Sequence, residues 1–286
     1  MNIFSIQQTM AAQGVVNLRR QQIGRKELRK LSTQGIHAYP MRPLSYSSLK
    51  EFAKSPLHYI EYVSKPKTAS TPMIAGKVFE ALLFGRDLQK DFVVFEKAEP
   101  TRDFRIKANQ VARNTARAQA QLEGKEAIEN TDLAQITQLA ALALQHPFMK
   151  RVKRYAFKHP AQKTIREKGS GLSLTGIPDL CFNRNKIGVD IKFVGSVAEF
   201  RKRIFGRQYA YWLQAAMYSL IYGYQEFYFF AVQSEPHHYA QAFHLDAESL
   251  TYLKDKLVDE LLLSFRWHLE HGFFATSERL IVPEYL

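Results

Sequence analysis

The stretch from residue 226 to 234, Glu-Phe-Tyr-Phe-Phe-Ala-Val-Gln-Ser, is the feature of the 286-residue chain that most restricts its fold. An apolar run of this length predicts a strand inside a sheet, with both of its faces covered. Residues 161–167, 173–182, 187–194 and 239–245 have the composition and pattern of further strands. A sheet is therefore the centre of the predicted fold.

Helical patterns surround the predicted strands. Residues 74–84, 131–145 and 247–270 predict helices, and a long helix at about 196–222 has a break near Gly206. Helices thus precede the cluster of strands, and the rest of the chain follows as helix, strand, strand and helix. This order predicts an α/β (α+β) domain with a central mixed β-sheet flanked by helices.

The length of the chain fits one large domain, or a domain with substantial insertions. We predict a single domain over residues 40–286 with a helical insertion at about 100–150. Residues 1–39 are predicted to form a basic N-terminal arm, because six arginines and lysines between residues 19 and 30 face a single acid, Glu27. A DNA-binding arm, a subunit contact and a poorly ordered terminus are all compatible with this pattern.

The chain carries 40 lysines and arginines against 27 aspartates and glutamates, a formal net charge of +13. A basic surface attracts polyanions, and nucleic acid is the first candidate, although a solvated surface without a partner can have the same composition. No run of about 18 apolar residues predicts a membrane-spanning helix, and the N-terminal residues lack the apolar core of a signal peptide. We therefore expect a cytoplasmic protein without a membrane partner.

Cys181 is the only cysteine of the sequence. One thiol cannot form a disulfide within the chain, a cysteine-based zinc site or a four-cysteine iron–sulfur cluster. Because Cys181 lies between Leu180 and Phe182 in a predicted strand, we expect a buried apolar residue rather than a nucleophile.

Two aspartates and a lysine lie within the predicted strands. Asp179 ends the sequence Gly176-Ile-Pro-Asp179, and Asp190-Ile-Lys192 follows with ten residues between the two aspartates. Side chains alternate along a strand, so Asp190 and Lys192 point to one face while the apolar residues between them point to the other. If the two strands form a hairpin, Asp179 lies beside Asp190, and two carboxylates and an ammonium group converge.

Such a group is suited to a hard divalent cation, because Mg²⁺ prefers carboxylate, carbonyl and water oxygens. A metal there polarises a phosphate and lowers the pKa of a bound water. Lys192 then orients that water or neutralises charge that develops in the transition state. Asp-x-Lys and Pro-Asp are each common in strands and turns, but their spacing and the apolar residues between them favour phosphodiester hydrolysis.

Gly176-Ile-Pro-Asp179 and Asp190-Ile-Lys192 resemble the signature of the PD-(D/E)XK nucleases. The resemblance implies a PD-(D/E)XK nuclease core in which Asp179, Asp190 and Lys192 are catalytic. It also implies that both carboxylates and the Ile191 backbone carbonyl bind Mg²⁺, for which Mn²⁺ is a substitute.

The following helix carries Gln214-Ala-Ala-Met-Tyr218, which resembles the Gln-xxx-Tyr motif of the RecB-like and RecE-like branches. Tyr211, Gln214 and Tyr218 lie at i, i+3 and i+7 and therefore share one face of the helix. The resemblance implies that this face looks into the site or contacts a DNA phosphate. A core helix with a tyrosine at its boundary is the alternative.

Two upstream segments, 45–59 and 76–83, are similar to the beginning of RecE-type exonucleases of the exonuclease VIII family. The second matches the family pattern Gly-x-x-His-x-x-Leu-Leu except that Phe79 replaces the histidine, which the family implies to be a metal ligand. Glu80 and His58 are the alternative donors. A site with fewer protein ligands and a site that has lost its activity also fit this departure.

Many RecB-like members also have a glutamate on the strand before Pro-Asp, and Gln162 and Glu167 lie in the corresponding region. Two histidine pairs are less promising as ligands. His237-His238 is expected to be solvated in a loop between strands, and His268 and His271 are expected at the surface of the last helix.

The resemblance as a whole implies a 5′-to-3′ exonuclease that acts on ends of double-stranded DNA in recombination. It further implies a ring-like homo-oligomer and a single-strand-annealing partner protein. One alternative is a DNA-binding protein of the same fold that has lost catalysis, and another is an endonuclease or single-strand nuclease. The iron–sulfur relatives need four cysteines, so the single cysteine argues against them.

Overall fold

The computed structural model describes residues 42–64, 69–97, 106–154, 160–182, 186–206 and 210–273. The predicted basic arm at 1–39 lies outside these ranges, so its role stays a prediction. Within the described ranges, no helix has the length and apolar character needed to cross a membrane.

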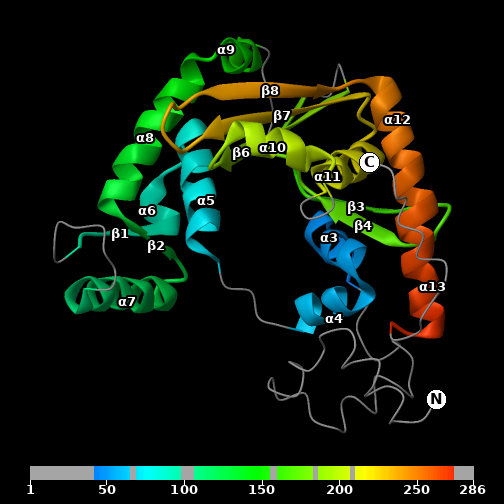
Figure 1. The fold of residues 1–286 in the computed structure, drawn as a ribbon, viewed down its shortest axis with the longest axis horizontal. Helices are drawn as coiled ribbons and strands as arrows, with labels where there is room; N and C mark the ends of the chain where they lie inside the picture. The colour runs from blue at the N-terminus through cyan, green and yellow to red at the C-terminus, as the bar shows by residue number, and fades with distance from the viewer. Residues whose placement is uncertain are drawn as a thin grey trace, which may run out of the picture.

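A four-stranded mixed sheet in the order β5-β6-β7-β8 is the centre of the fold (Figure 1). β6 (Ile187–Val194) pairs antiparallel with β5 (Leu180–Phe182) and parallel with β7 (Glu226–Gln233). β7 also pairs antiparallel with β8 (Ala240–Leu245). The apolar run at 226–234 thus occupies an interior strand, as predicted, and most of its side chains are buried.

Helices cover both faces of this sheet, which confirms the predicted fold class. The helices of one face, called the α5 face, are α5 (Thr71–Leu83), α8 (Asn130–Gln145) and α9 (Pro147–Arg154). The helices of the other face, called the α11 face, are α10 (Val197–Ile204), α11 (Tyr211–Tyr222) and α12 (Ala247–Lys256). Because α10 ends before Gly206 and α11 begins after it, the predicted break is confirmed.

The segment 173–182, predicted as one strand, is two strands of different sheets. β4 (Ser173–Gly176) pairs with β3 (Lys163–Arg166) in a separate hairpin, whereas β5 belongs to the main sheet. Pro178 lies between β4 and β5 and has no N–H to donate to a ladder. The chain leaves one sheet and enters the other at this proline.

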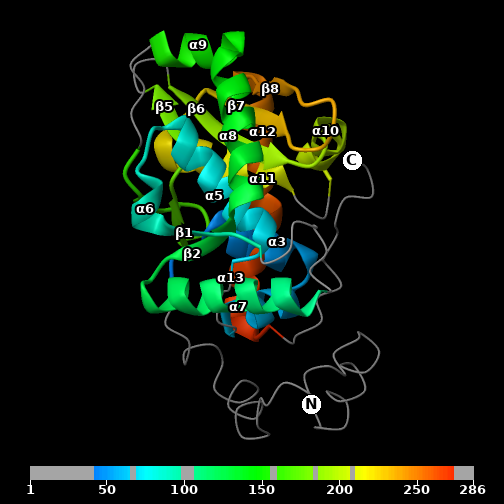
Figure 2. The ribbon, with the colours of Figure 1, turned by 90° about the vertical axis from the view of Figure 1, so that its left-hand side faces the viewer.

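A second small sheet lies beside the α5 face. β1 (Phe92–Phe95) pairs in parallel with β2 (Glu126–Glu129), with α6 (Leu88–Asp91) before it and α7 (Lys107–Leu122) between the two strands. Figure 2 shows this sheet and α7 next to α5 and α8. The region predicted as a helical insertion thus also contains a strand, and α8 packs against α5 in the main core.

α3 (Tyr46–Lys54) has Ser45 as its N-cap residue. The Ser45 hydroxyl accepts a hydrogen bond from the Ser48 N–H, and the Ser48 hydroxyl accepts one from the Ser45 N–H, at 3.3 and 2.9 Å. This reciprocal pair satisfies two backbone donors at the helix start. α4 (Pro56–Ser64) follows after one residue.

The last helix, predicted as one element, continues from α12 through a π-helical segment (Leu257–Leu262) into α13 (Leu263–His271). The prediction that His268 lies at the surface is wrong, because its side chain is buried against Phe52. His271 is exposed as predicted. The difference arises because α3 covers the face of α13 that carries His268.

The remaining small predictions agree with the structure. Cys181 is buried and forms no disulfide among the described residues, and both residues of His237-His238 are exposed.

Candidate active site

β5 and β6 bring the two aspartates of the sequence motif together. Their register pairs Leu180 with Val189, so Asp179 lies beside Asp190, one residue further along the hairpin. The Ile191 N–H donates a hydrogen bond to Asp179 Oδ2 at 2.6 Å. Since a strand residue presents its N–H and its C=O to the same side, the Ile191 carbonyl also faces Asp179.

Lys192 completes the cluster from the same face of β6. Its ammonium group forms an ion pair with Asp190 Oδ2 and lies 5.3 Å from the centre of the Tyr211 ring. Burial alone lowers the pKa of Lys192, but attraction by Asp190 and Asp179 outweighs it, and the net effect raises the pKa. With these carboxylates beside it, Lys192 is a cation and a hydrogen-bond donor at neutral pH.

Both carboxylates have environments that disfavour a bare negative charge. Burial raises the pKa of Asp179 well above its usual range, and repulsion by Asp190 and Glu80 adds to this effect. Burial also raises the pKa of Asp190, although Lys192 counteracts part of the shift. A cation between the two carboxylates would offset this repulsion, which is the electrostatic signature of a site for a positive ligand.

α11 positions the Asp190 carboxylate through the predicted Gln-xxx-Tyr motif. Gln214 Nε2 donates to Asp190 Oδ1 at 2.8 Å and lies 3.3 Å from the Tyr218 hydroxyl oxygen. The side chains of Gln214 and Tyr218 are buried, and Gln214 contacts the carboxylate directly whereas Tyr218 contacts Gln214. Among the described residues, the buried Gln214 Oε1 has no hydrogen-bond partner.

Gly176 explains why the motif begins with a glycine. A Cβ atom at this position would lie 2.6 Å from Tyr218 Cε1, far inside van der Waals contact. The Tyr222 hydroxyl donates to the Gly176 carbonyl at 2.8 Å. The absence of a side chain thus lets α11 approach the β4–β5 connection closely and bring Gln214 to Asp190.

Two residues of α3 that belong to none of the sequence motifs also lie at the site. The Tyr46 ring stacks on Tyr211 with 6.5 Å between centroids, and the Lys50 ammonium lies 5.7 Å from the Tyr46 ring. Burial raises the pKa of the Tyr46 hydroxyl, and the positive charge of Lys192 acts against that shift. The i, i+4 spacing of Tyr46 and Lys50 after a capping serine was the available signal.

Phe79, which stands where the related family has histidine, is buried on the α5 face. Its ring stacks on Phe193 with 4.8 Å between centroids. Glu80 forms an ion pair with Arg86 at 2.7 Å and is close enough to Asp179 to raise its pKa. Glu80 is therefore the acidic residue of α5 that reaches the site electrostatically.

The other candidate donors have local partners elsewhere. His58 hydrogen-bonds Ser55 at 2.7 Å, and Gln162 donates to Thr175 at 3.0 Å. Glu167 accepts hydrogen bonds from the turn that joins β3 and β4. None of the three has a hydrogen bond or ion pair with the two aspartates among the contacts of the described residues.

The donor set fits Mg²⁺ better than a metal that needs an all-protein cage. Within the described ranges, no three His, Cys, Asp or Glu side chains are grouped closely enough to hold a metal. Asp179, Asp190 and the Ile191 carbonyl are the available oxygens. Mg²⁺ keeps several waters and is commonly bound through one or two carboxylates plus substrate phosphates, whereas structural Zn²⁺ takes four protein ligands.

Residues 45–271 match the model of a family described as PDDEXK-like domain of unknown function (DUF3799). The chain belongs to this family. The resemblance to PD-(D/E)XK nucleases deduced from Asp179, Asp190 and Lys192 is thereby confirmed, and the mixed sheet with helices on both faces agrees with the PDDEXK-like fold.

One solved structure shows the same fold in a distant protein. The PDDEXK-like chain is similar to a "Putative exonuclease" from Eubacterium rectale, with a TM-score of 0.52 and 13% identity over 88% of each chain. A phage-related exonuclease from Haemophilus somnus matches with a TM-score of 0.32 and 12% identity, over 67% of this chain and 93% of the other. No curated protein matches the chain.

Proposed function

We propose that this PDDEXK-like protein is a Mg²⁺-dependent deoxyribonuclease that hydrolyses phosphodiester bonds at the ends of double-stranded DNA. The observation that carries the proposal is the cluster of Asp179, Lys192 and the buried Asp190, in which Gln214 fixes one carboxylate. The net charge of +13 supports a polyanionic substrate. The resemblance to RecE-type exonucleases adds four further parts to the proposal. These are action in the 5′-to-3′ direction, a role in recombination in the cytoplasm, a homo-oligomer and a single-strand-annealing partner.

The mechanism assigns a separate task to each residue. Asp179, Asp190 and the Ile191 carbonyl would hold Mg²⁺, and the chemistry it supplies when bound is activation of water and polarisation of a phosphate. The Lys192 ammonium donates a hydrogen bond to the attacking water or to the phosphate oxygen where negative charge develops. Gln214 keeps Asp190 oriented, and the Ile191 N–H keeps Asp179 oriented, so the ligands need little rearrangement during the reaction.

A second function is favoured by one observation, the buried Phe79 at the position of the family's histidine. A site with one protein ligand fewer binds a metal more weakly. The protein would then be a DNA-binding protein that has kept the fold without catalysis. This alternative predicts DNA binding that weakens with salt, without cleavage in Mg²⁺ or Mn²⁺.

Digestion of linear and circular duplex DNA tests the proposal. We expect the wild-type protein to degrade linear DNA in Mg²⁺ and to spare covalently closed circles, because an exonuclease needs an end. Asp190→Asn should abolish this activity, whereas Asp255→Asn, the same change at an exposed position of α12, should not. Duplexes labelled at the 5′ or the 3′ end would give the direction from the order in which label is released.

The outcomes separate the candidates. Full activity in Asp190→Asn would refute the site assignment. Cleavage of circles would indicate an endonuclease, and digestion of single strands alone would indicate a single-strand nuclease. Binding without cleavage, in Mg²⁺ and in Mn²⁺, would favour the DNA-binding alternative.

A further inference from the structure

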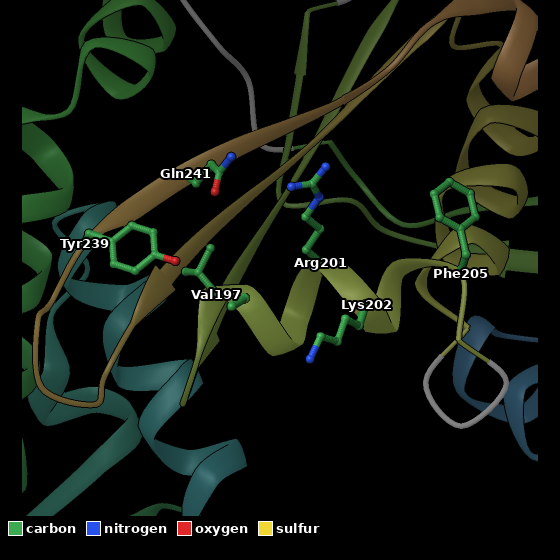
Figure 3. A pocket seen from close by; sticks show the side chains of 7 residues that line it. Val197, Arg201, Lys202, Phe205, Tyr239 and Gln241 are labelled. Atoms are coloured by element: carbon green, nitrogen blue, oxygen red, sulfur yellow. The ribbon is translucent and has the colours of Figure 1, made fainter.

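A groove between α10 and β8 lies on the α11 face, outside the cluster of catalytic candidates. It has a volume of about 600 Å³. Its lining includes Val197 at the base, with Arg201 and Lys202 from α10 and Tyr239 and Gln241 from the edge of the sheet. Figure 3 shows the Arg201 guanidinium extending into the space between the helix and β8, with the polar ends of Tyr239 and Gln241 directed toward the same space.

The helical side of the groove is basic. The last turn of α10 carries Arg201, Lys202 and Arg203, all exposed. Glu199 is the acidic residue of this helix, and it forms an ion pair with Lys202 at 2.8 Å. The cations therefore exceed the acids on α10, and the groove suits a polyanionic occupant.

Exposed aromatic rings flank these cations. Phe205 at the end of α10 and Tyr239 before β8 both line the groove, and 44% and 40% of their surfaces are exposed. Cations combined with exposed aromatic rings are the features by which proteins bind single-stranded nucleic acid, because phosphates pair with the cations and bases stack on the rings. Bases of a duplex are already stacked on each other, so a single strand fits this surface better than a duplex.

The groove is one helix away from the catalytic candidates. The Lys192 ammonium lies over the Tyr211 ring, and Tyr211 packs against Phe200 with 4.9 Å between ring centroids. Phe200 belongs to α10 and in turn contacts Phe243 of β8 at 5.5 Å. The packed rings thus extend from the site on β6 to the parts of α10 and β8 that lie beside the groove.

We propose that the groove between α10 and β8 binds single-stranded DNA, namely the strand that becomes unpaired when the protein digests its partner from an end. The proposal rests on the proposed nuclease function for the source of the strand. The binding itself depends only on the residues of the groove. It can therefore be measured without catalysis.

The test is fluorescence anisotropy of a labelled oligothymidylate of about 20 nucleotides with the full chain, in EDTA so that no DNA is cleaved. The double variant Arg201→Gln/Lys202→Gln should weaken binding about tenfold. It should also reduce the magnitude of the slope of log association constant against log salt concentration by about 1.4, since each lost phosphate contact removes about 0.7 for single strands. Tyr239→Ala should weaken binding about fivefold at constant salt slope, because it removes stacking and no charge.

The matched control is Lys150→Gln/Arg151→Gln, which removes two exposed cations from α9 on the opposite face of the sheet. We expect its single-strand affinity to stay within about twofold of the wild type, as for any distant pair of surface charges. A blunt duplex of the same length should bind all four proteins with similar affinity. Equal losses for the duplex and the single strand would overturn the assignment to single strands.

Unchanged single-strand binding in both groove variants would overturn the proposal. Failure of the nuclease proposal has a different readout. It would appear as absent cleavage in Mg²⁺, while groove-dependent binding in EDTA would persist.

Discussion

The two faces of β6 differ in chemistry, because one carries charged side chains and the other carries apolar side chains. On the α11 face, Asp190 and Lys192 form an ion pair and Gln214 hydrogen-bonds the carboxylate. On the α5 face, Val189 is fully buried in an apolar cluster that also contains Phe79. Alternation along the strand places these two sets of β6 side chains on opposite faces.

The difference teaches which face stabilises the fold and which face serves the reaction. Buried charges and their partners contribute little net stability, because desolvation offsets most of their attraction. Apolar burial contributes roughly 1.5–3 kcal/mol for each large side chain. Substitutions of apolar side chains on the α5 face of β6 should therefore reduce the free energy of unfolding, and substitutions of Asp190, Lys192 and Gln214 should reduce activity.

Phe79→Ala should have the largest effect, and the effect should be on stability. The ring is 1% exposed and stacks on Phe193, so its removal should cost about 3–5 kcal/mol of unfolding free energy. Urea denaturation measures this cost, with Phe205→Ala at an exposed position as the control. The remaining folded protein should retain its activity within about twofold, and a selective loss of catalysis would contradict the division between the faces.

Lys192→Met should have the next largest effect, on the rate of cleavage. Methionine keeps most of the aliphatic volume but removes the donor near the reacting phosphate, which should lower kcat by about 10²–10³-fold. Single-turnover cleavage of an end-labelled duplex gives the rate, and Lys150→Met on α9 is the control. A rate within about threefold of the wild type would show that Lys192 serves only as the partner of Asp190.

Gln214→Met should have an intermediate effect and identifies a positioning residue. Without its hydrogen bond to Asp190 Oδ1, the carboxylate is less firmly oriented, and metal affinity should fall by about 10–100-fold. The readout is the Mg²⁺ concentration at half-maximal activity, which a purely structural role would leave unchanged. If saturating Mg²⁺ fails to restore the rate, Gln214 acts on something other than metal binding.

The parts of the site that sequence could predict depend on short-range geometry. Asp190 and Lys192 share a face because the side-chain period of a strand is two residues. Asp179 follows from the hairpin, whose register needs only neighbouring residues. The same local reasoning failed at Pro178, because a strand-like pattern continues through it while the hydrogen-bond ladder cannot.

The parts that could not be predicted depend on packing between distant segments. Tyr46 and Lys50 reach the site only because α3 packs against α11, more than 160 residues further along the chain. β2 is four residues long, and two of them are glutamates, so it gives little strand signal. Spacing at i, i+3 relates His268 to His271 but does not say which of them faces the core.

The smallest expected effect concerns His268 and the pH dependence of stability. This buried histidine shows that polar groups also occur inside the apolar core of the α11 face. Burial lowers the pKa of His268 below that of a histidine in the unfolded chain, even though the Ser264 carbonyl acts in the opposite direction. Between these two pKa values the unfolded chain binds more protons, so stability is complete above about pH 6.5 and declines as the pH falls below it. His268→Leu should flatten this decline in urea midpoints measured from neutral to mildly acidic pH. His238→Leu, at an exposed position before β8, should leave the decline unchanged. If the decline persists in His268→Leu, another group takes up the proton. His268 is then a packing residue that stays neutral at neutral and at mildly acidic pH.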